Sequence, residues 1–169
     1  MADVAHYLID EHKELLLHIE ELRIVADSVG DFPPRLLLRV IDKLYDFLIN
    51  QLIPHAQAEE ETLYPAVAKI LGTPQATATM SRDHAEVSEL TGRLRVLRPQ
   101  ICTSGFDADK TKELRRLLYG LYTLLKLHFA KEEELYLPML DASLGEIEAH
   151  ELFHQLAAIS HDETRHLHH

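Results

Sequence analysis

The chain contains the same short motif twice, and an isolated histidine precedes each copy. Residues 55–65 and residues 128–138 both begin with His-x3-Glu, continue with two more glutamates, and contain a tyrosine and a proline near their ends. His12 precedes the first copy and His84 precedes the second at nearly the same distance. This tandem duplication of histidines and carboxylates is typical of a dinuclear metal site inside a helical bundle.

The composition indicates one globular domain. Of the 169 residues, 46% are hydrophobic and 27% are charged, with only six glycines and seven prolines. Such a chain is long enough to bury a core and has few linker residues. We expect a single domain over residues 1–169, with a core bundle over about residues 2–140 and a C-terminal helix over about residues 143–160.

The charge and the cysteine content exclude several classes of function. The net charge is −11 and no run of Lys or Arg occurs, which argues against nucleic acid and an anionic membrane surface as partners. Cys102 stands alone, so an intrachain disulfide and a cysteine-based metal site are excluded. No signal peptide and no membrane-spanning run of about 20 apolar residues is visible, and we expect a cytoplasmic protein.

Apolar residues recur at helical spacing in four long segments and one shorter segment, and no sustained strand-like alternation competes with them. The expected helices cover about residues 2–29, 34–64, 74–98, 107–136 and 143–160. Because the connections are short, the predicted fold is all-α: an antiparallel up-down four-helix bundle with an additional C-terminal helix.

Local signals refine these boundaries. Pro54 should kink the second helix just before His55. Thr73 and Asp107 are suitable N-caps for the third and fourth helices, and the residues from 99 to 106 are expected to form a loop. Ser143 and Glu146 have the spacing of a capping box that would open the fifth helix.

The duplicated residues fall on the apolar faces of the predicted helices. His55 and Glu59 are four residues apart and therefore share a face, which also carries Leu52 and Leu63. The second copy and the two upstream histidines follow the same pattern. The candidate metal ligands are therefore His12, His55, Glu59, His84, His128 and Glu132.

Two metal ions would explain why these carboxylates lie in a core. An ionised carboxylate there costs several kcal/mol unless it is compensated. Each ion would take two histidine nitrogens, and Glu59 and Glu132 would bridge the pair, which leaves exchangeable positions on both ions. Imidazole and carboxylate with open positions suit iron, with manganese or zinc as substitutes. An alternative is a structural bundle whose histidines are incidental.

Other polar residues have a simpler interpretation. The remaining glutamates of the two motifs are expected on solvated helix faces, with a supporting role behind the ligands for some of them; they are Glu60, Glu61, Glu133 and Glu134. The histidines outside the six candidate ligands are expected at the surface, including the i,i+4 pair on the fifth helix and the C-terminal group; they are His6, His18, His150, His154, His161, His166, His168 and His169.

Taken together, these residues resemble the hemerythrin-like family, also called the HHE cation-binding domain. The resemblance covers about residues 8–140. It implies a non-haem di-iron centre in a four-helix bundle, with the four candidate histidines as terminal ligands and with Glu59 and Glu132 as bridges. His12 and His55 would hold one iron, and His84 and His128 the other.

One position departs from the oxygen-carrying members of that family. Those members place a fifth histidine one turn after the histidine of the third helix, and here that position is Ser88. Reversible oxygen carriage is therefore in doubt, and the ligand set is similar to that of bacterial members associated with nitrosative and oxidative stress. We expect the iron held by His84 and His128 to be as open as its twin.

The predicted function is therefore that of a di-iron protein that binds or reacts with a small diatomic or peroxide ligand, meaning oxygen, nitric oxide or peroxide. It would act as a sensor, a carrier or a stress-response protein. Two alternatives stay open: a peroxide-consuming di-iron oxidoreductase, and a protein that stores iron or delivers it to damaged iron centres. The sequence predicts no particular protein partner.

Overall fold

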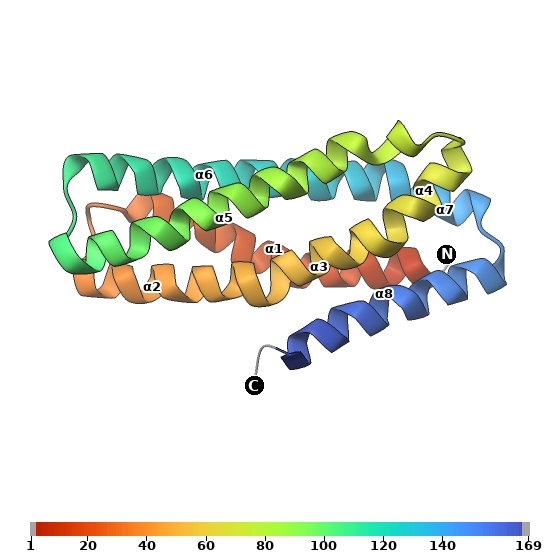
Figure 1. Cartoon of the computed structure of the whole chain (residues 1–169), viewed down its shortest axis with the longest axis horizontal. Coiled ribbons are helices and arrows are strands. Elements are labelled where there is room, and N and C mark those ends of the chain that lie inside the picture. Colours follow the sequence, from red (N-terminus) through yellow and green to blue (C-terminus); the bar gives the residue numbers. More distant parts are fainter. Residues whose placement is uncertain (1–2, 167–169) are drawn as a thin grey trace.

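The chain folds into long helices that lie side by side along most of the length of the molecule (Figure 1). The computed structural model describes the backbone of residues 3–166 and the side chains of residues 4–159. Within these residues every regular element is helical, as the apolar periodicity predicts. In chain order the elements are α1 (Asp3–Ser28), α2 (Pro34–Phe47), η1 (Leu48–Leu52), α3 (Ile53–Ala58), η2 (Glu59–Leu63), α4 (Tyr64–Leu71), η3 (Pro74–Thr77), α5 (Ala78–Ser104), α6 (Ala108–Lys131), η4 (Glu132–Tyr136), α7 (Leu137–Ser143) and α8 (Glu146–His166).

The described elements form four long helical runs and one additional helix. The runs are α1, α2 to α4, α5, and α6 to α7. The first run packs against α6 and α2, and α5 also packs against α6 and α2. The additional helix, α8, packs on α1, α3 and η2 and lies along one side of the bundle (Figure 1). No helix in the described part of the chain combines the length and the apolar character needed to cross a bilayer.

Three short π-helical turns interrupt the second and fourth runs, and a proline follows each of them. They are η1, η2 and η4, and the prolines are Pro54, Pro65 and Pro138. A proline in a helix removes one backbone hydrogen bond and clashes with the carbonyl four residues earlier, and a wider turn relieves that clash. The disturbance expected at Pro54 therefore takes the form of a π turn, and the run remains helical.

The loop expected over residues 99–106 is shorter in the structure and covers residues 105–107. The helix α5 continues to Ser104 with Pro99 inside it. Leu97 and Ile101, on either side of Pro99, are buried. Burying two such side chains contributes about 3–6 kcal/mol, which offsets the roughly 3 kcal/mol that an interior proline costs. Packing therefore keeps this segment helical.

The expected caps have mixed outcomes. The Thr73 hydroxyl accepts a hydrogen bond from the Gln75 amide, and the Asp107 carboxylate accepts one from the Lys110 amide, so both predicted N-caps are confirmed. The capping box at Ser143 is wrong, because Ser143 ends α7 and α8 begins at Glu146. The bond that forms joins the Gly145 amide to the Glu148 carboxylate at 3.3 Å. The side chains of the C-terminal histidines expected at the surface lie outside the described residues.

The core consists of two apolar clusters with a polar layer between them. One cluster extends from Leu15 of α1 to Ile101 of α5, and the other gathers Leu8, Leu63 and residues of α7 and α8. Each of the four runs passes from one cluster to the other near its candidate histidine. The polar residues of the duplicated motif thus meet in one layer inside an otherwise apolar bundle.

Candidate metal centre

The structure brings the six candidate ligands together from the four helical runs. The histidines come from α1, α3, α5 and α6, and the two glutamates are the first residues of the π turns η2 and η4. Five of the six side chains are buried, and His84 is partly exposed. The duplication in the sequence therefore becomes a single buried cluster, in which each motif supplies one histidine and one carboxylate.

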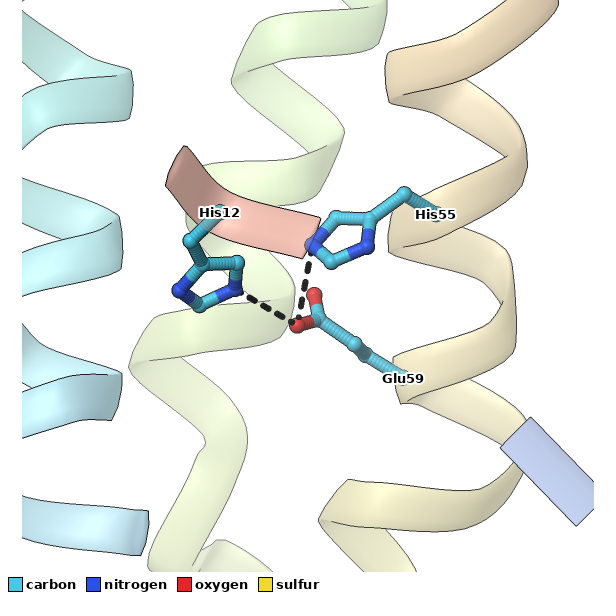
Figure 2. A group of neighbouring side chains, drawn as sticks. All are labelled: His12, His55 and Glu59. Carbon is cyan, nitrogen blue, oxygen red and sulfur yellow. Dashed lines mark ion pairs between the residues drawn. The ribbon is translucent and has the colours of Figure 1, made fainter. Parts of the chain in front are cut away.

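His12 and His55 both point toward Glu59 (Figure 2). Their Nε2 atoms lie 3.7 Å and 3.1 Å from Glu59 Oε1. The Nε2 atom of His12 also lies 3.5 Å from Glu132 Oε2. One oxygen of each glutamate is therefore directed to this half of the site.

His84 and His128 face the other side. The Nε2 atom of His84 lies 3.3 Å from Glu59 Oε2, and that of His128 lies 3.3 Å from Glu132 Oε1. Each glutamate thus presents one oxygen to each pair of histidines. The groups His12–His55–Glu59 and Glu59–His84–His128 both have their donor atoms close enough together to hold one metal ion.

Several polar atoms at this centre are buried without a hydrogen-bond partner. They are His12 Nε2, His55 Nε2, Glu59 Oε1, Glu59 Oε2 and Glu132 Oε2. Leaving a buried polar atom unsatisfied costs about 1–3 kcal/mol, and more for a charged group. Such a concentration of unsatisfied donors and acceptors at one point is explained by a bound cation, which imidazole nitrogens and carboxylate oxygens both coordinate.

The buried charges of the site stabilise one another. Burial acts to raise the pKa of the Glu59 carboxyl, but the charge of His55 and the nearby rings of His12 and His84 outweigh it and lower this pKa well below its usual range. Burial acts to lower the pKa of His55, and the charge of Glu59 together with the contact to Glu11 raises it well above its usual value. Protonated imidazole therefore supplies positive charge that a metal ion would otherwise bring.

A second layer of carboxylates holds the outer nitrogens of the four histidines. Each Nδ1 atom lies 2.8–3.3 Å from an acidic oxygen of another helical run; the pairs are Glu133–His12, Glu11–His55, Glu60–His84 and Asp83–His128. Because a carboxylate only accepts, each Nδ1 carries a proton, and Nε2 is the nitrogen that faces the centre and would bind a metal ion after losing any proton of its own. These pairs link the four runs in a closed ring.

The ring was only partly predicted from the sequence. Glu60 and Glu133 were expected at solvated positions with a supporting role, and the structure places them on His84 and His12. Sequence reasoning missed Glu11 and Asp83. A signal was present, because each of these acids directly precedes a candidate histidine and belongs to the same duplication. Glu61 and Glu134 are exposed, as expected.

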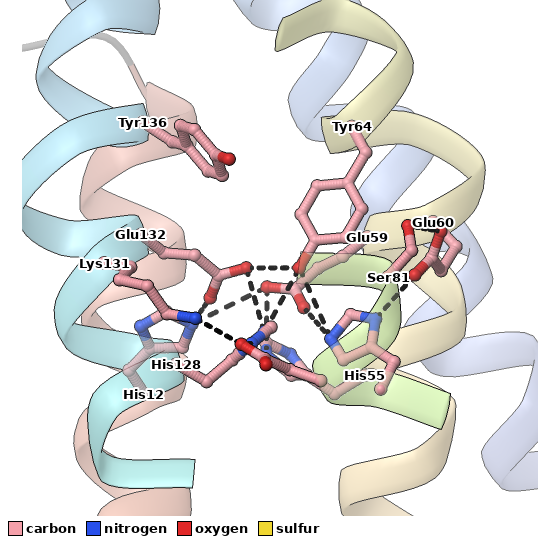
Figure 3. A network of polar contacts seen from close by, with 12 residues as sticks. His12, His55, Glu59, Glu60, Tyr64, Ser81, His128, Lys131, Glu132 and Tyr136 are labelled. Carbon is pink, nitrogen blue, oxygen red and sulfur yellow. Dashed lines mark hydrogen bonds and ion pairs between the residues drawn. The ribbon is translucent and has the colours of Figure 1, made fainter. Parts of the chain in front are cut away.

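Sequence reasoning also missed the role of Tyr64, which is buried at the centre (Figure 3). Its hydroxyl donates to Glu132 Oε1 at 2.8 Å and lies 3.2 Å from His128 Nε2 and 3.4 Å from His84 Nε2. Burial and the nearby glutamates raise the pKa of Tyr64 above its usual range, so the phenol keeps its proton and remains a donor.

The π turn η2 explains how Tyr64 reaches the centre. Tyr64 is five residues after Glu59, and in a regular α-helix it would project about 140° away from it. One extra residue in the turn offsets about 100° of that rotation, so both side chains point inward. This orientation depends on a π turn that the helical periodicity of the sequence does not predict.

Ser88, expected beside His84 at a position where no ligand would replace the further histidine, lies outside the cluster. Ser88 is exposed on α5, and it is the Tyr64 hydroxyl that lies beside His84 and His128. The half of the site that these histidines form is therefore not as open as its twin. Helical spacing placed Ser88 one turn from His84, but the face toward the core is continued by Val87.

The other described histidines lie away from the centre. His6 and His18 are on the outer side of α1, where they pair with Asp10 and Glu21. His150 and His154 are exposed on α8 with their Nε2 atoms 3.0 Å apart. These positions agree with the expectation of surface histidines.

A comparison of the sequence with models of protein families finds a match. The model of the hemerythrin HHE cation binding domain family matches residues 3–140, which include all six candidate ligands, Tyr64 and the outer carboxylates. Neither the curated proteins nor the solved structures contain a match. Because the family match covers most of the chain, this protein belongs to the hemerythrin HHE cation-binding family.

Proposed function

We propose that the polar layer is a dinuclear iron centre. His12 and His55 would hold one ion, His84 and His128 the other, and Glu59 and Glu132 would bridge them. The observation that carries this proposal is the cluster of buried, unpartnered nitrogen and oxygen atoms where the two motifs meet. Imidazole and carboxylate ligands favour iron, and manganese or zinc can replace it.

A small ligand is the substrate class that this site favours. The four protein donors proposed for each ion leave coordination positions for exogenous molecules, and iron supplies the redox chemistry. Apolar clusters enclose the site on both sides, and the Phe129 ring stacks on His12 with centroids 4.1 Å apart. We therefore propose that the protein binds or reacts with oxygen, nitric oxide or peroxide as a sensor, carrier or stress-response protein.

The chain's own residues would prepare the site for this chemistry. The outer carboxylates fix the tautomer and orientation of the histidines, so that the four Nε2 atoms need no rearrangement on metal binding. Phe129 and the apolar clusters limit access of water. Tyr64 provides a hydrogen-bond donor on one side of the site.

Elemental analysis together with the optical spectrum of aerobically purified protein tests the proposal. We expect close to two iron ions per chain and absorption of a ferric dinuclear centre. The C-terminal histidines are four further imidazoles that could contribute to the metal content, so a variant with alanine at His161, His166, His168 and His169 is the control and should retain the same stoichiometry. A folded protein with iron content near zero would overturn the proposal.

Two further measurements separate this function from its alternatives. Catalytic turnover of hydrogen peroxide, rather than a stoichiometric spectral change, would indicate a peroxide-consuming oxidoreductase. Rapid loss of iron to a weak chelator would indicate storage or delivery. The carboxylates that contact the histidine Nδ1 atoms argue against storage or delivery, because such pairs increase metal affinity and would keep the iron bound.

The wider expectations form part of the same proposal. The short connections between the runs support an antiparallel up-down order within one domain that includes α8. The net charge of −11 argues against nucleic acid and anionic membranes as partners, and we also propose a cytoplasmic location.

A further inference from the structure

The two halves of the proposed dinuclear centre differ in how their polar atoms are satisfied. In the His12–His55 half, both Nε2 atoms and the facing oxygens of Glu59 and Glu132 have no hydrogen-bond partner. In the other half, the Tyr64 hydroxyl contacts both histidine Nε2 atoms and donates to Glu132 Oε1, and Glu59 Oε2 is the ligand atom left without a partner. The Tyr64 hydroxyl is thus the main difference between the two sets of ligands, which are otherwise similar.

The difference originates at one position of the duplicated motif. When the two copies are aligned on their glutamates and prolines, Tyr64 corresponds to Leu137, because each lies five residues after its glutamate and directly before its proline. Both side chains are buried. The leucine side chain has no hydrogen-bonding atom. Leu137 therefore cannot do for the His12–His55 half what the Tyr64 hydroxyl does for the His84–His128 half.

A metal ion entering the two halves would meet different resistance. In the His12–His55 half it replaces no hydrogen bond within the protein and satisfies atoms that are otherwise unpaired. In the His84–His128 half it must first displace the phenol from Glu132. We propose that the His12–His55 position binds metal first and that Tyr64 delays occupation of its twin. This order rests on the proposed dinuclear centre.

The expected preference is about tenfold or more, the factor that corresponds to losing one hydrogen bond to a charged group. Repulsion between two divalent ions also weakens the second binding step, but repulsion does not depend on which position is occupied first. The preference between positions at limiting metal is therefore the quantity that reports on Tyr64.

Nitrogen NMR of the histidine rings measures this preference directly. Full-length metal-free protein is titrated with Zn²⁺, which is diamagnetic and binds imidazole nitrogen, at about pH 8 to lessen competition from imidazole protons. Below one equivalent, the Nε2 resonances of His12 and His55 should report bound metal. Those of His84 and His128 should follow only with the second equivalent.

Two tyrosine variants isolate the cause. Tyr64→Phe keeps the ring and removes the hydroxyl, and it should make both positions fill in parallel. Tyr136→Phe is the matched control, because the Tyr136 hydroxyl donates to the Ala76 carbonyl instead of the site; its order of filling should remain that of the unmodified protein.

Each other result overturns the inference. Parallel filling in the unmodified protein would show that the phenol is no obstacle, and earlier filling of the His84–His128 position would show that Tyr64 attracts metal. A preference that persists in Tyr64→Phe would assign it to another cause. If no ring nitrogen of the six-residue cluster responds to two equivalents of Zn²⁺, the dinuclear centre itself fails, a result distinct from a changed order.

Discussion

Replacing Glu59 by glutamine should remove most of the stabilisation that metal gives to the fold. Glu59 Oε1 lies 3.1 Å from His55 Nε2, and its Oε2 lies 3.3 Å from His84 Nε2, so the carboxylate serves both proposed ions. Loss of one partner from a buried charge pair costs about 3–5 kcal/mol. A hundredfold change in affinity corresponds to roughly 2.8 kcal/mol, which is less than this loss, so the substitution should raise each Kd for metal at least a hundredfold.

The magnitude follows from linkage. An ion at a free concentration of 100 times its Kd stabilises the folded state by about 2.7 kcal/mol, so two ions give about 5.4 kcal/mol. For a chain of this size, that amounts to a rise in Tm of about 11–22 °C. With both Kd values raised a hundredfold, each ion gives about 0.4 kcal/mol at the same free metal, and the rise shrinks to about 2–3 °C.

The assay is the difference in Tm between chelated and zinc-loaded protein at buffered free Zn²⁺, which cancels any effect on the metal-free fold. Two neighbours of Glu59 provide graded controls. Glu60→Gln removes a partner of His84 Nδ1 and should weaken binding about 10–100-fold, whereas Glu61→Gln changes an exposed side chain and should leave the rise intact. Equal rises for Glu59→Gln and Glu61→Gln would refute the assignment of Glu59 as a bridge.

Three further outcomes are expected. The pKa of His55 is raised and that of Glu59 is lowered, so their contribution to the metal-free fold is complete between about pH 4.5 and pH 6.5. This contribution is lost as pH rises through the elevated pKa of His55. Chemical denaturation of the metal-free protein should therefore show lower stability at pH 9 than at pH 6. Higher stability at pH 9 would contradict the pairing of His55 with Glu59. Asp83→Asn should weaken metal binding about 10–100-fold by releasing His128 Nδ1, which isothermal titration with Zn²⁺ measures; unchanged affinity would exclude a supporting role for Asp83. Ser88→His should leave the Zn²⁺ stoichiometry and the optical response of the iron-loaded protein to oxygen unchanged, because Ser88 is exposed; a longer-lived oxygen adduct in that variant would show that the new imidazole reaches the iron.

Much of the site was determined by the sequence because its residues obey helical periodicity. His55 and Glu59 share a face in any α-helix, and the duplication in the chain requires a second face of the same kind. Burial of both faces in one core then brings the two copies together. Glu11 and Asp83 follow the same duplication, since each directly precedes a histidine, and they were open to prediction although sequence reasoning overlooked them.

The helix boundaries show where local signals are insufficient. Pro99 is a helix breaker by its own chemistry, yet Leu97 and Ile101 bury their side chains on either side of it and the helix continues to Ser104. At Ser143 the sequence offered a capping box, and the chain uses Gly145 and Glu148 instead. Local propensities of about 1 kcal/mol are readily overridden by the burial of side chains from other elements.

The sequence by itself determined that four histidines and two carboxylates would meet on the apolar faces of a helical bundle, because periodicity and duplication are properties of the chain. Only the tertiary structure decided that the two halves of the centre differ. Tyr64 lies five residues after Glu59 and would face away from it in a regular helix, but the π turn before Pro65 directs it inward. There its hydroxyl reaches Glu132 and His128, residues of another helical run that only folding brings within hydrogen-bond distance.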